Sequence, residues 1–103
     1  MLEYVLEVTF TNARIKKVCT QASIARKKHG HRIAQALQQR ISEIESAKSV
    51  EEMIQWKIGR CHKLSHNRKE SYAVDLDKLV RLVFRVIENG VQIAEIIEIV
   101  DYH

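Results

Sequence analysis

The sequence predicts an α+β domain: an antiparallel four-stranded sheet with an N-terminal helical hairpin and a short third helix packed on it. Three observations carry this prediction. Alternating apolar residues open the chain, apolar residues at helical spacing follow, and three strand-like runs close it. At 103 residues the chain has room for one core, so we expect a single domain spanning residues 1–103.

The first half of the chain changes from strand period to helix period. Apolar and polar residues alternate over residues 2–10, as in a half-buried strand. Thr11 or Asn12 can cap the helix that follows, in which a break near Thr20 is possible. Gly30 ends that helix, and the short turn there predicts an antiparallel hairpin with a second helix.

The turn of this hairpin holds two histidines, His29 and His31, on either side of the glycine. Paired histidines raise the question of a metal site. No further ligands stand at useful spacing, so we interpret both as turn residues and expect no metal.

The third helix begins at a capping box, in which Ser49 is followed by Glu52 three residues later. Its expected buried face consists of Met53, Ile54 and Trp56. Gly59 ends it, and residues 60–70 then form a polar, basic loop.

The remaining strands are predicted over residues 72–76, 80–86 and 95–103, the last two joined by the Asn-Gly turn at residues 89–90. This hairpin places Arg81 at the end of its strand nearest the C-terminus. The basic loop lies beside that terminus only if it folds back over the sheet.

The terminal strand has apolar residues on both faces, which predicts a central strand buried on both sides. It stops on Asp101, Tyr102 and His103, three groups able to exchange protons. We interpret them as a candidate catalytic corner, although an ideal strand places Tyr102 on the face opposite the other two. The alternative is a polar strand end lying in water.

Charge is segregated along the chain, whose formal net charge is +4. Residues 8–42 carry eight basic residues and no acidic one, and residues 57–69 carry five more without an acid. Such a surface favours a polyanion. A solvated helix surface and an acidic protein partner are the alternatives.

Other features of the sequence indicate the cellular compartment. No basic region followed by an apolar run opens the chain, and no run is long enough to span a bilayer. The two cysteines, Cys19 and Cys61, form no Cys-x-x-Cys pair, which is typical of thiols in a reducing cytosol. We expect a cytoplasmic protein with no membrane association.

Several segments along the chain carry a family resemblance: Ile58-Gly-Arg-Cys-His62, Arg68, Tyr72-Ala-Val-Asp75, Arg81-Leu-Val-Phe84 and the closing Glu98-Ile-Val-Asp-Tyr-His103. The chain resembles the HigB-type toxins, plasmid maintenance killer proteins of the RelE/ParE superfamily, over its whole length. The resemblance implies a RelE-like fold and cleavage of messenger RNA on the ribosome, without a metal or other cofactor. It implies neutralisation by a helix-turn-helix, HigA-like antitoxin.

Carried over by position, the resemblance implies a catalytic set of six residues: His62, Arg68, Arg81, Asp101, Tyr102 and His103. In metal-free cleavage the ribose 2′-hydroxyl attacks its own phosphate, which needs a base, an acid and cations around the phosphorane. Histidines can fill the first two roles and arginines the third. Basic-loop residues expected to bind RNA are Lys57, Arg60, Lys63, His66 and Lys69.

The loop departs from the family pattern at one important position, because Ser65 stands where a transition-state lysine is common. Lys63 or His66 can supply the missing charge from a neighbouring position. The alternative is an attenuated or non-catalytic protein on the same scaffold, which binds a gyrase-type protein target or only its antitoxin.

Overall fold

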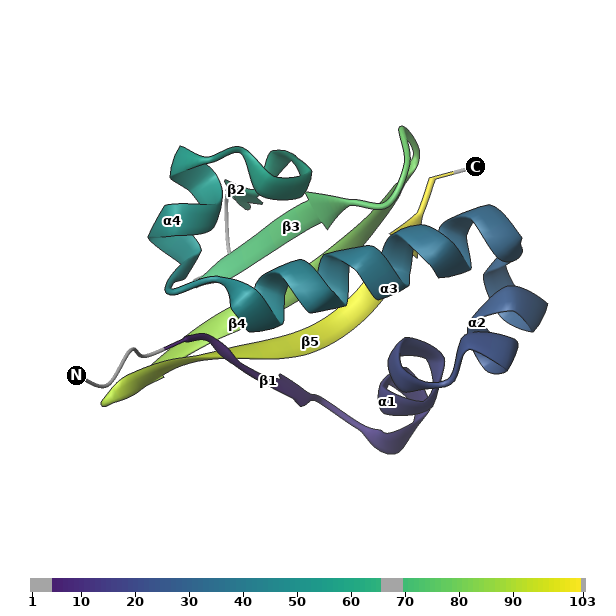
Figure 1. Ribbon diagram of the computed structural model, residues 1–103, viewed down its shortest axis with the longest axis horizontal. Coiled ribbons are helices and arrows are strands. Elements are labelled where there is room, and N and C mark those ends of the chain that lie inside the picture. Colours follow the sequence, from purple (N-terminus) through teal and green to yellow (C-terminus); the bar gives the residue numbers. More distant parts are fainter. Residues whose placement is uncertain (1–4, 66–69, 103) are drawn as a thin grey trace.

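The computed structural model describes residues 5–65 and 70–102 as one mixed sheet with helices against it (Figure 1). Its elements in order are β1 (Glu7–Phe10), α1 (Ala13–Thr20), α2 (Ala22–His29), α3 (His31–Ser46), α4 (Val50–Gln55), the 3-10 turn η1 (Ile58–Arg60), β2 (His62–Lys63), β3 (Ser71–Asp75), β4 (Val80–Asn89) and β5 (Val91–Asp101). Five strands pair in the order β1-β5-β4-β3-β2.

The sheet differs from the expected one in strand number and direction. The predicted loop contributes the two-residue strand β2, which pairs antiparallel with β3 and makes the fifth strand. β1 runs parallel to β5, so the sheet is not wholly antiparallel. Parallel pairing needs a long crossover, and the helices between β1 and the rest of the sheet provide one.

The break that the sequence allowed near Thr20 is present, and it divides the first helical segment into α1 and α2 at Gln21. Asn12 caps α1 by accepting a hydrogen bond from the Ile15 amide at 3.0 Å. Gln21 is extended, with φ −119°, and it separates α1 from α2. Gly30 then ends α2 with φ 88°, as the turn prediction required.

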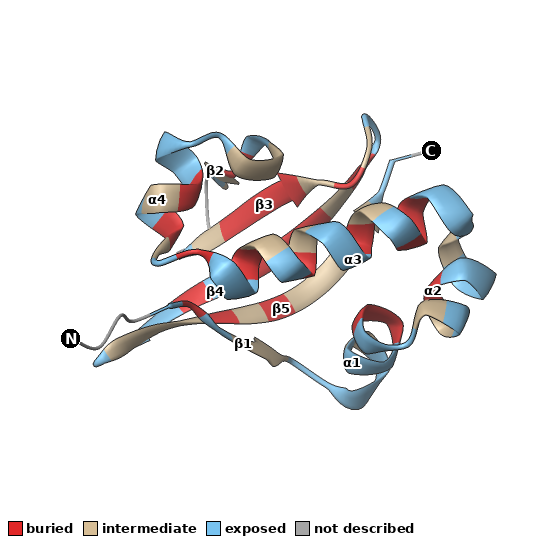
Figure 2. Cartoon of the chain, in the orientation of Figure 1, coloured by how far each residue is buried: buried red, intermediate tan, exposed pale blue. Residues whose placement is uncertain are grey.

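The core lies between the helices and one face of the sheet (Figure 2). From α3 it takes Leu37, Ile41 and Ile44, and from β4 it takes alternate residues, among them Leu82 and Phe84. The expected face of α4 is only partly correct. Met53 is buried, whereas Ile54 is exposed and Trp56 is exposed just beyond the end of the helix.

β5 is not buried on both faces. Only Ala94 and Ile96 are fully buried, both toward the helices, and its other described residues are half-buried or exposed. In the part of the chain that the structure describes, no helix is long and apolar enough to cross a membrane.

The turn at Gly59 joins a helix to the far edge of the sheet. Lys57, Gly59 and Arg60 all have left-handed backbone, with φ of 54°, 56° and 54°. A Cβ added to Gly59 would lie 2.6 Å from Nε of Arg40, the same atom that donates a hydrogen bond to the Asp75 carbonyl at 2.9 Å. Glycine is favoured here by conformation, and the close approach of Arg40 leaves no space for a Cβ unless that side chain moves.

We expect Gly59→Ala to lower the free energy of unfolding by about 2–4 kcal/mol, since strain in the left-handed region adds to a displaced Arg40. The matched control is Gly90→Ala, which has φ 79° but nothing within 4 Å of the added carbon. Its cost should stay near 1 kcal/mol, the conformational part alone. Urea unfolding of both variants checks this, and equal losses would contradict the close approach of Arg40.

Cys19 and Cys61 are both free and buried, which agrees with the expected thiols. Burial raises the pKa of Cys19 to about 11 and the pKa of Cys61 to about 12. The thiolate is the reactive form, so both thiols should be inert in the folded protein.

Labelling with iodoacetamide at pH 8 tests this. We expect both thiols to react at least about 100-fold more slowly in the native protein than in urea, because their pKa values lie about two or more units above the ordinary one. Mass spectrometry of the peptides separates the two sites. Rapid native labelling of Cys61 would show that the segment before β2 opens readily.

Candidate functional site

A pocket of about 180 Å³ lies on the sheet face opposite the helices. Residues directly opposite each other in adjacent strands share a face, so the pairs Ala73 with Val83 and Arg81 with Val100 lie together on this side. The described residues that line it come from the start of the basic loop and from β3, β4 and the end of β5: Leu64, Ser65, Ala73, Arg81, Val83, Val100 and Tyr102. The start of the basic loop thus lies on the same pocket as the end of β5.

Arg81 and Tyr102 form the polar side of the pocket. The guanidinium carbon of Arg81 lies over the Tyr102 ring, 5.7 Å from its centroid. The tyrosine is 61% exposed, and its amide donates a hydrogen bond to the Leu79 carbonyl at 2.8 Å, which fixes the end of the chain beside the β3–β4 turn. A cation and an exposed aromatic ring in contact suit a phosphate next to a stacked base.

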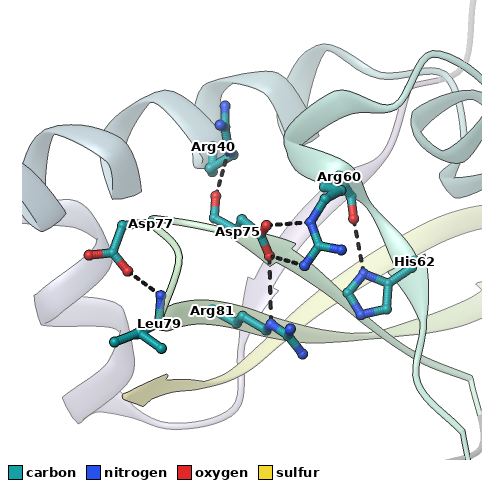
Figure 3. Close-up of polar contacts among 7 residues, drawn as sticks. All are labelled: Arg40, Arg60, His62, Asp75, Asp77, Leu79 and Arg81. Atoms are coloured by element: carbon teal, nitrogen blue, oxygen red, sulfur yellow. Dashed lines mark hydrogen bonds and ion pairs between the residues drawn. The ribbon is translucent and has the colours of Figure 1, made fainter. Parts of the chain in front are cut away.

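Asp75 holds the cations of this face together (Figure 3). Its Oδ1 lies 3.6 Å from Nε of Arg81. Its Oδ2 accepts a hydrogen bond from Nε of Arg60 at 2.6 Å, and Oδ1 accepts one from Nη2 of Arg60 at 3.3 Å. These hydrogen bonds raise the pKa of the Arg60 guanidinium, and Arg40 fixes the Asp75 backbone from the helix side.

His62 lies on the same face, one strand further along. It pairs with Ala73, and its Nδ1 is 2.9 Å from the Arg60 carbonyl oxygen (Figure 3). A carbonyl only accepts, so Nδ1 carries a proton and Nε2 is the nitrogen that can take or give one. The imidazole ring is not one of the residues that line the pocket. It lies beside Arg60 on β2, the edge strand of the sheet.

Asp101 is on the other side of the sheet. It pairs with Val80, whose side chain belongs to the core. Burial and the charge of Lys28 lower the pKa of His29 at the end of α2, and the Asp101 charge opposes that shift from the same side of the sheet. The structure therefore brings Arg81, Tyr102 and His62 to one face but not Asp101. Arg68 and His103 lie outside the described residues.

The expected RNA-binding residues separate in the same way. Arg60 belongs to the pocket face, whereas Lys63 pairs with Tyr72, a core residue, and so lies on the opposite side of β2 from His62. Lys57 is exposed at the left-handed turn. His66 and Lys69 lie outside the described residues.

The first basic block forms a separate surface over α1, α2 and the start of α3. Its members are all exposed: Arg14, Lys16, Lys17, Arg26, Lys27, Lys28 and Arg32. Arg40 is the exception, since it bonds Glu43 at 2.6 Å and the Asp75 carbonyl. We call these seven exposed cations the basic helical surface.

Within residues 5–65 and 70–102, no group of three or more His, Cys, Asp or Glu side chains is placed to hold a metal ion. The described residues of the pocket face supply cations, a carboxylate, a phenol and an imidazole. Such groups can bind a phosphodiester and move protons around it.

Asp75 belongs to the motif at residues 72–75, yet sequence reasoning gave it no role. Its role was foreseeable from the predicted turn between the strands at residues 72–76 and 80–86. Counting outward from that turn places Asp75 opposite Arg81, and opposite charges at paired positions attract.

No protein-family model matches the chain, and no curated protein sequence matches it. Solved structures do. The YoeB/ParE toxin from Agrobacterium tumefaciens superposes with a TM-score of 0.61 at 13% identity, over 95% of this chain and 100% of that chain. YoeB from Staphylococcus aureus, solved as a dimer and in complex with YefM, gives 0.62 at 19% identity, over 95% of this chain and 97% of that chain. The chain therefore has the α+β fold of YoeB/ParE and RelE-like toxins, as its sequence predicted.

Proposed function

We propose that this chain is the toxin of a type II toxin–antitoxin system and that it cleaves messenger RNA on the ribosome. The observation that carries the proposal is the meeting of Arg81, Tyr102 and the loop residue Ser65 around one pocket, with His62 on the same face. The fold shared with YoeB/ParE-type toxins supports it.

In the proposed reaction the ribose 2′-hydroxyl attacks the adjacent phosphate, and no metal takes part. His62 Nε2 exchanges a proton with the reacting oxygens, Arg81 stabilises the negative charge of the phosphorane, and Tyr102 stacks on a base. His103 is the second proton-transfer group and Arg68 a further phosphate ligand in this proposal. Asp101 is assigned no proton, because it faces the helices and the Arg60 carbonyl already orients the imidazole.

The proposed partner is an antitoxin encoded beside the toxin, and the proposed place of action is the cytoplasm, where ribosomes are. The structure of Staphylococcus aureus YoeB in complex with YefM supports an antitoxin partner. The closing Asp-Tyr-His supports the HigB branch, and with it a HigA-like, helix-turn-helix antitoxin and a part in plasmid maintenance.

One observation favours a second candidate, a non-catalytic protein on this fold. Ser65 lines the pocket at the position where the family commonly has a lysine, so one cationic stabiliser is absent there. Such a protein would bind a gyrase-type target or only its antitoxin.

Cleavage of ribosome-bound messenger by purified variants decides between the two. We expect Arg81→Ala and His62→Gln each to lower the single-turnover rate by roughly 10²–10³, because each removes transition-state stabilisation or proton transfer. His103→Gln should act likewise. Restoring the family residue with Ser65→Lys should raise the rate.

The matched control is Arg85→Ala. Arg85 lies on the same strand and face as Arg81, but it pairs with Glu95 at 2.7 Å and does not line the pocket. It should keep the wild-type rate. If neither the wild-type chain nor Ser65→Lys cuts RNA, the non-catalytic candidate takes the place of the enzyme.

The basic helical surface makes a separate prediction about ribosome binding. Replacing Lys16 and Lys27 by glutamine should weaken binding at low salt and reduce the slope of log K against log salt by about 0.7–0.9 per lost phosphate contact. The cleavage rate of the bound complex should not change. An unaltered slope would assign this surface to an acidic protein partner or to solvent.

A further inference from the structure

We propose that Asp75 is a positioning residue that holds Arg60 and Arg81 as a two-guanidinium clamp for one backbone phosphate of RNA. The inference rests on the proposed RNA-cleaving function and adds to it a substrate contact. Arg60 becomes a phosphate ligand of the pocket, and Asp75 acts only through the two arginines.

The geometry of the carboxylate carries the first step. Asp75 and Arg81 are cross-strand partners, and Oδ1 of Asp75 lies 3.6 Å from Nε of Arg81 and 3.3 Å from Nη2 of Arg60. Both guanidinium groups therefore approach the same oxygen. Two cations around one carboxylate leave a net positive charge at the pocket, which favours an anion.

Unused donors carry the second step. A guanidinium has five N–H groups, and Asp75 engages two nitrogens of Arg60 and faces one of Arg81. The Arg60 side chain is 64% exposed and that of Arg81 is 31% exposed, so the remaining donors can reach a ligand. Guanidinium groups bind phosphate oxygens in a bidentate manner, and two held side by side can share one phosphate.

The backbone around Asp75 and Arg60 is built to hold them. Arg40 fixes the Asp75 carbonyl from the core side at 2.9 Å. Arg60 has φ 54°, an unfavourable conformation for a residue with a side chain, at a turn that favours glycine at position 59. Exposed ion pairs contribute little to stability, so strain at such a pair points to a role in binding.

The clamp also supplies a positive charge to a site that has Ser65 where a lysine is common in the resembled family. Lys63 lies on the other side of β2, so it does not supply the charge that the loop lacks. Arg60 does lie on the pocket face, through its contact with Asp75. Among the residues that the structure describes, Arg60 in the turn before β2 is therefore the cation that joins Arg81 at the proposed site.

The competing explanation is a purely structural bridge that attaches η1 to β3. A third effect has the opposite sign: removing the Asp75 charge alone would strengthen RNA binding, because one anion is lost next to a phosphate. The clamp predicts weaker binding on loss of Asp75, so the direction of the change separates it from simple electrostatics.

The experiment measures the affinity of the full chain for a short 2′-O-methyl RNA, which cannot be cleaved, together with kcat and KM on ribosome-bound messenger. We expect Asp75→Asn and Arg60→Ala each to weaken RNA binding about tenfold, the loss of one charge-assisted contact. The double variant should lose less affinity than the two single losses combined, because Asp75 acts in part through Arg60 and in part through Arg81. Asp75→Glu should restore much of the affinity.

The matched control is Glu95→Gln, which breaks the other carboxylate–arginine pair of this face, Arg85 with Glu95, and should leave RNA affinity unchanged. The clamp is overturned if Asp75→Asn lowers the melting temperature but binds RNA as tightly as the wild-type chain, or more tightly. Additive losses in the double variant also overturn it. A wild-type chain that binds the RNA through these residues but cuts no messenger refutes the proposed enzyme and leaves the clamp standing.

Discussion

β4 and β5 pair along almost their whole length, and a bulge between Val83 and Phe84 interrupts the register. Phe84 faces Ile96 and Val83 faces Glu98, so Ile97 is an extra residue in β5. An extra residue exchanges the two faces for everything that follows it. Because of it, Val100 and Tyr102 lie beside Arg81, and Asp101 faces the helices.

The pocket depends on this bulge more than on any single side chain. In a strand without the bulge, every second residue after Ile96 would point toward the core, and Tyr102 would be one of them. With the bulge, Ile96 belongs to the core, Ile99 packs against it, and Tyr102 lies on the opposite face. One inserted residue thus satisfies packing and the site together.

Much of the fold was readable from local signals. The Asn-Gly turn, the capping box at Ser49 and Gly30 each specify a backbone conformation, and the structure has the expected element at each. The bulge could not be predicted, because four residues around it are all apolar and do not indicate which of them face the core: Ile96, Ile97, Ile99 and Val100. The parallel pairing of β1 also escaped prediction, because it depends on where the helices return the chain.

Part of the site was predictable from the hairpin and from strand alternation. The Asn-Gly hairpin placed Arg81 at the end of its strand nearest the C-terminus, and alternation separated Tyr102 from Asp101; both hold. The contact between Arg81 and Tyr102 depends on the bulge, which was not predicted. The candidate catalytic corner at residues 101–103 is therefore divided as strand alternation indicated, with Asp101 on the helix side and Tyr102 on the pocket side. Arg60 was expected to bind RNA only as a member of the basic loop, and its pairing with Asp75 had no local signal, because it joins a left-handed turn to a carboxylate fifteen positions away in the sequence.

The nature of the cation at this pocket bears on how the proposed reaction is stabilised. A lysine is a flexible point charge, which must lose side-chain freedom to meet a phosphate. Arg60 is already held by hydrogen bonds to Asp75, and Asp75 is held through Arg40 and the ladder. Stabilisation of a developing charge is largest when the donors are oriented beforehand. A site that lacks lysine at Ser65 can therefore retain transition-state stabilisation, provided that its guanidinium groups are positioned by the sheet.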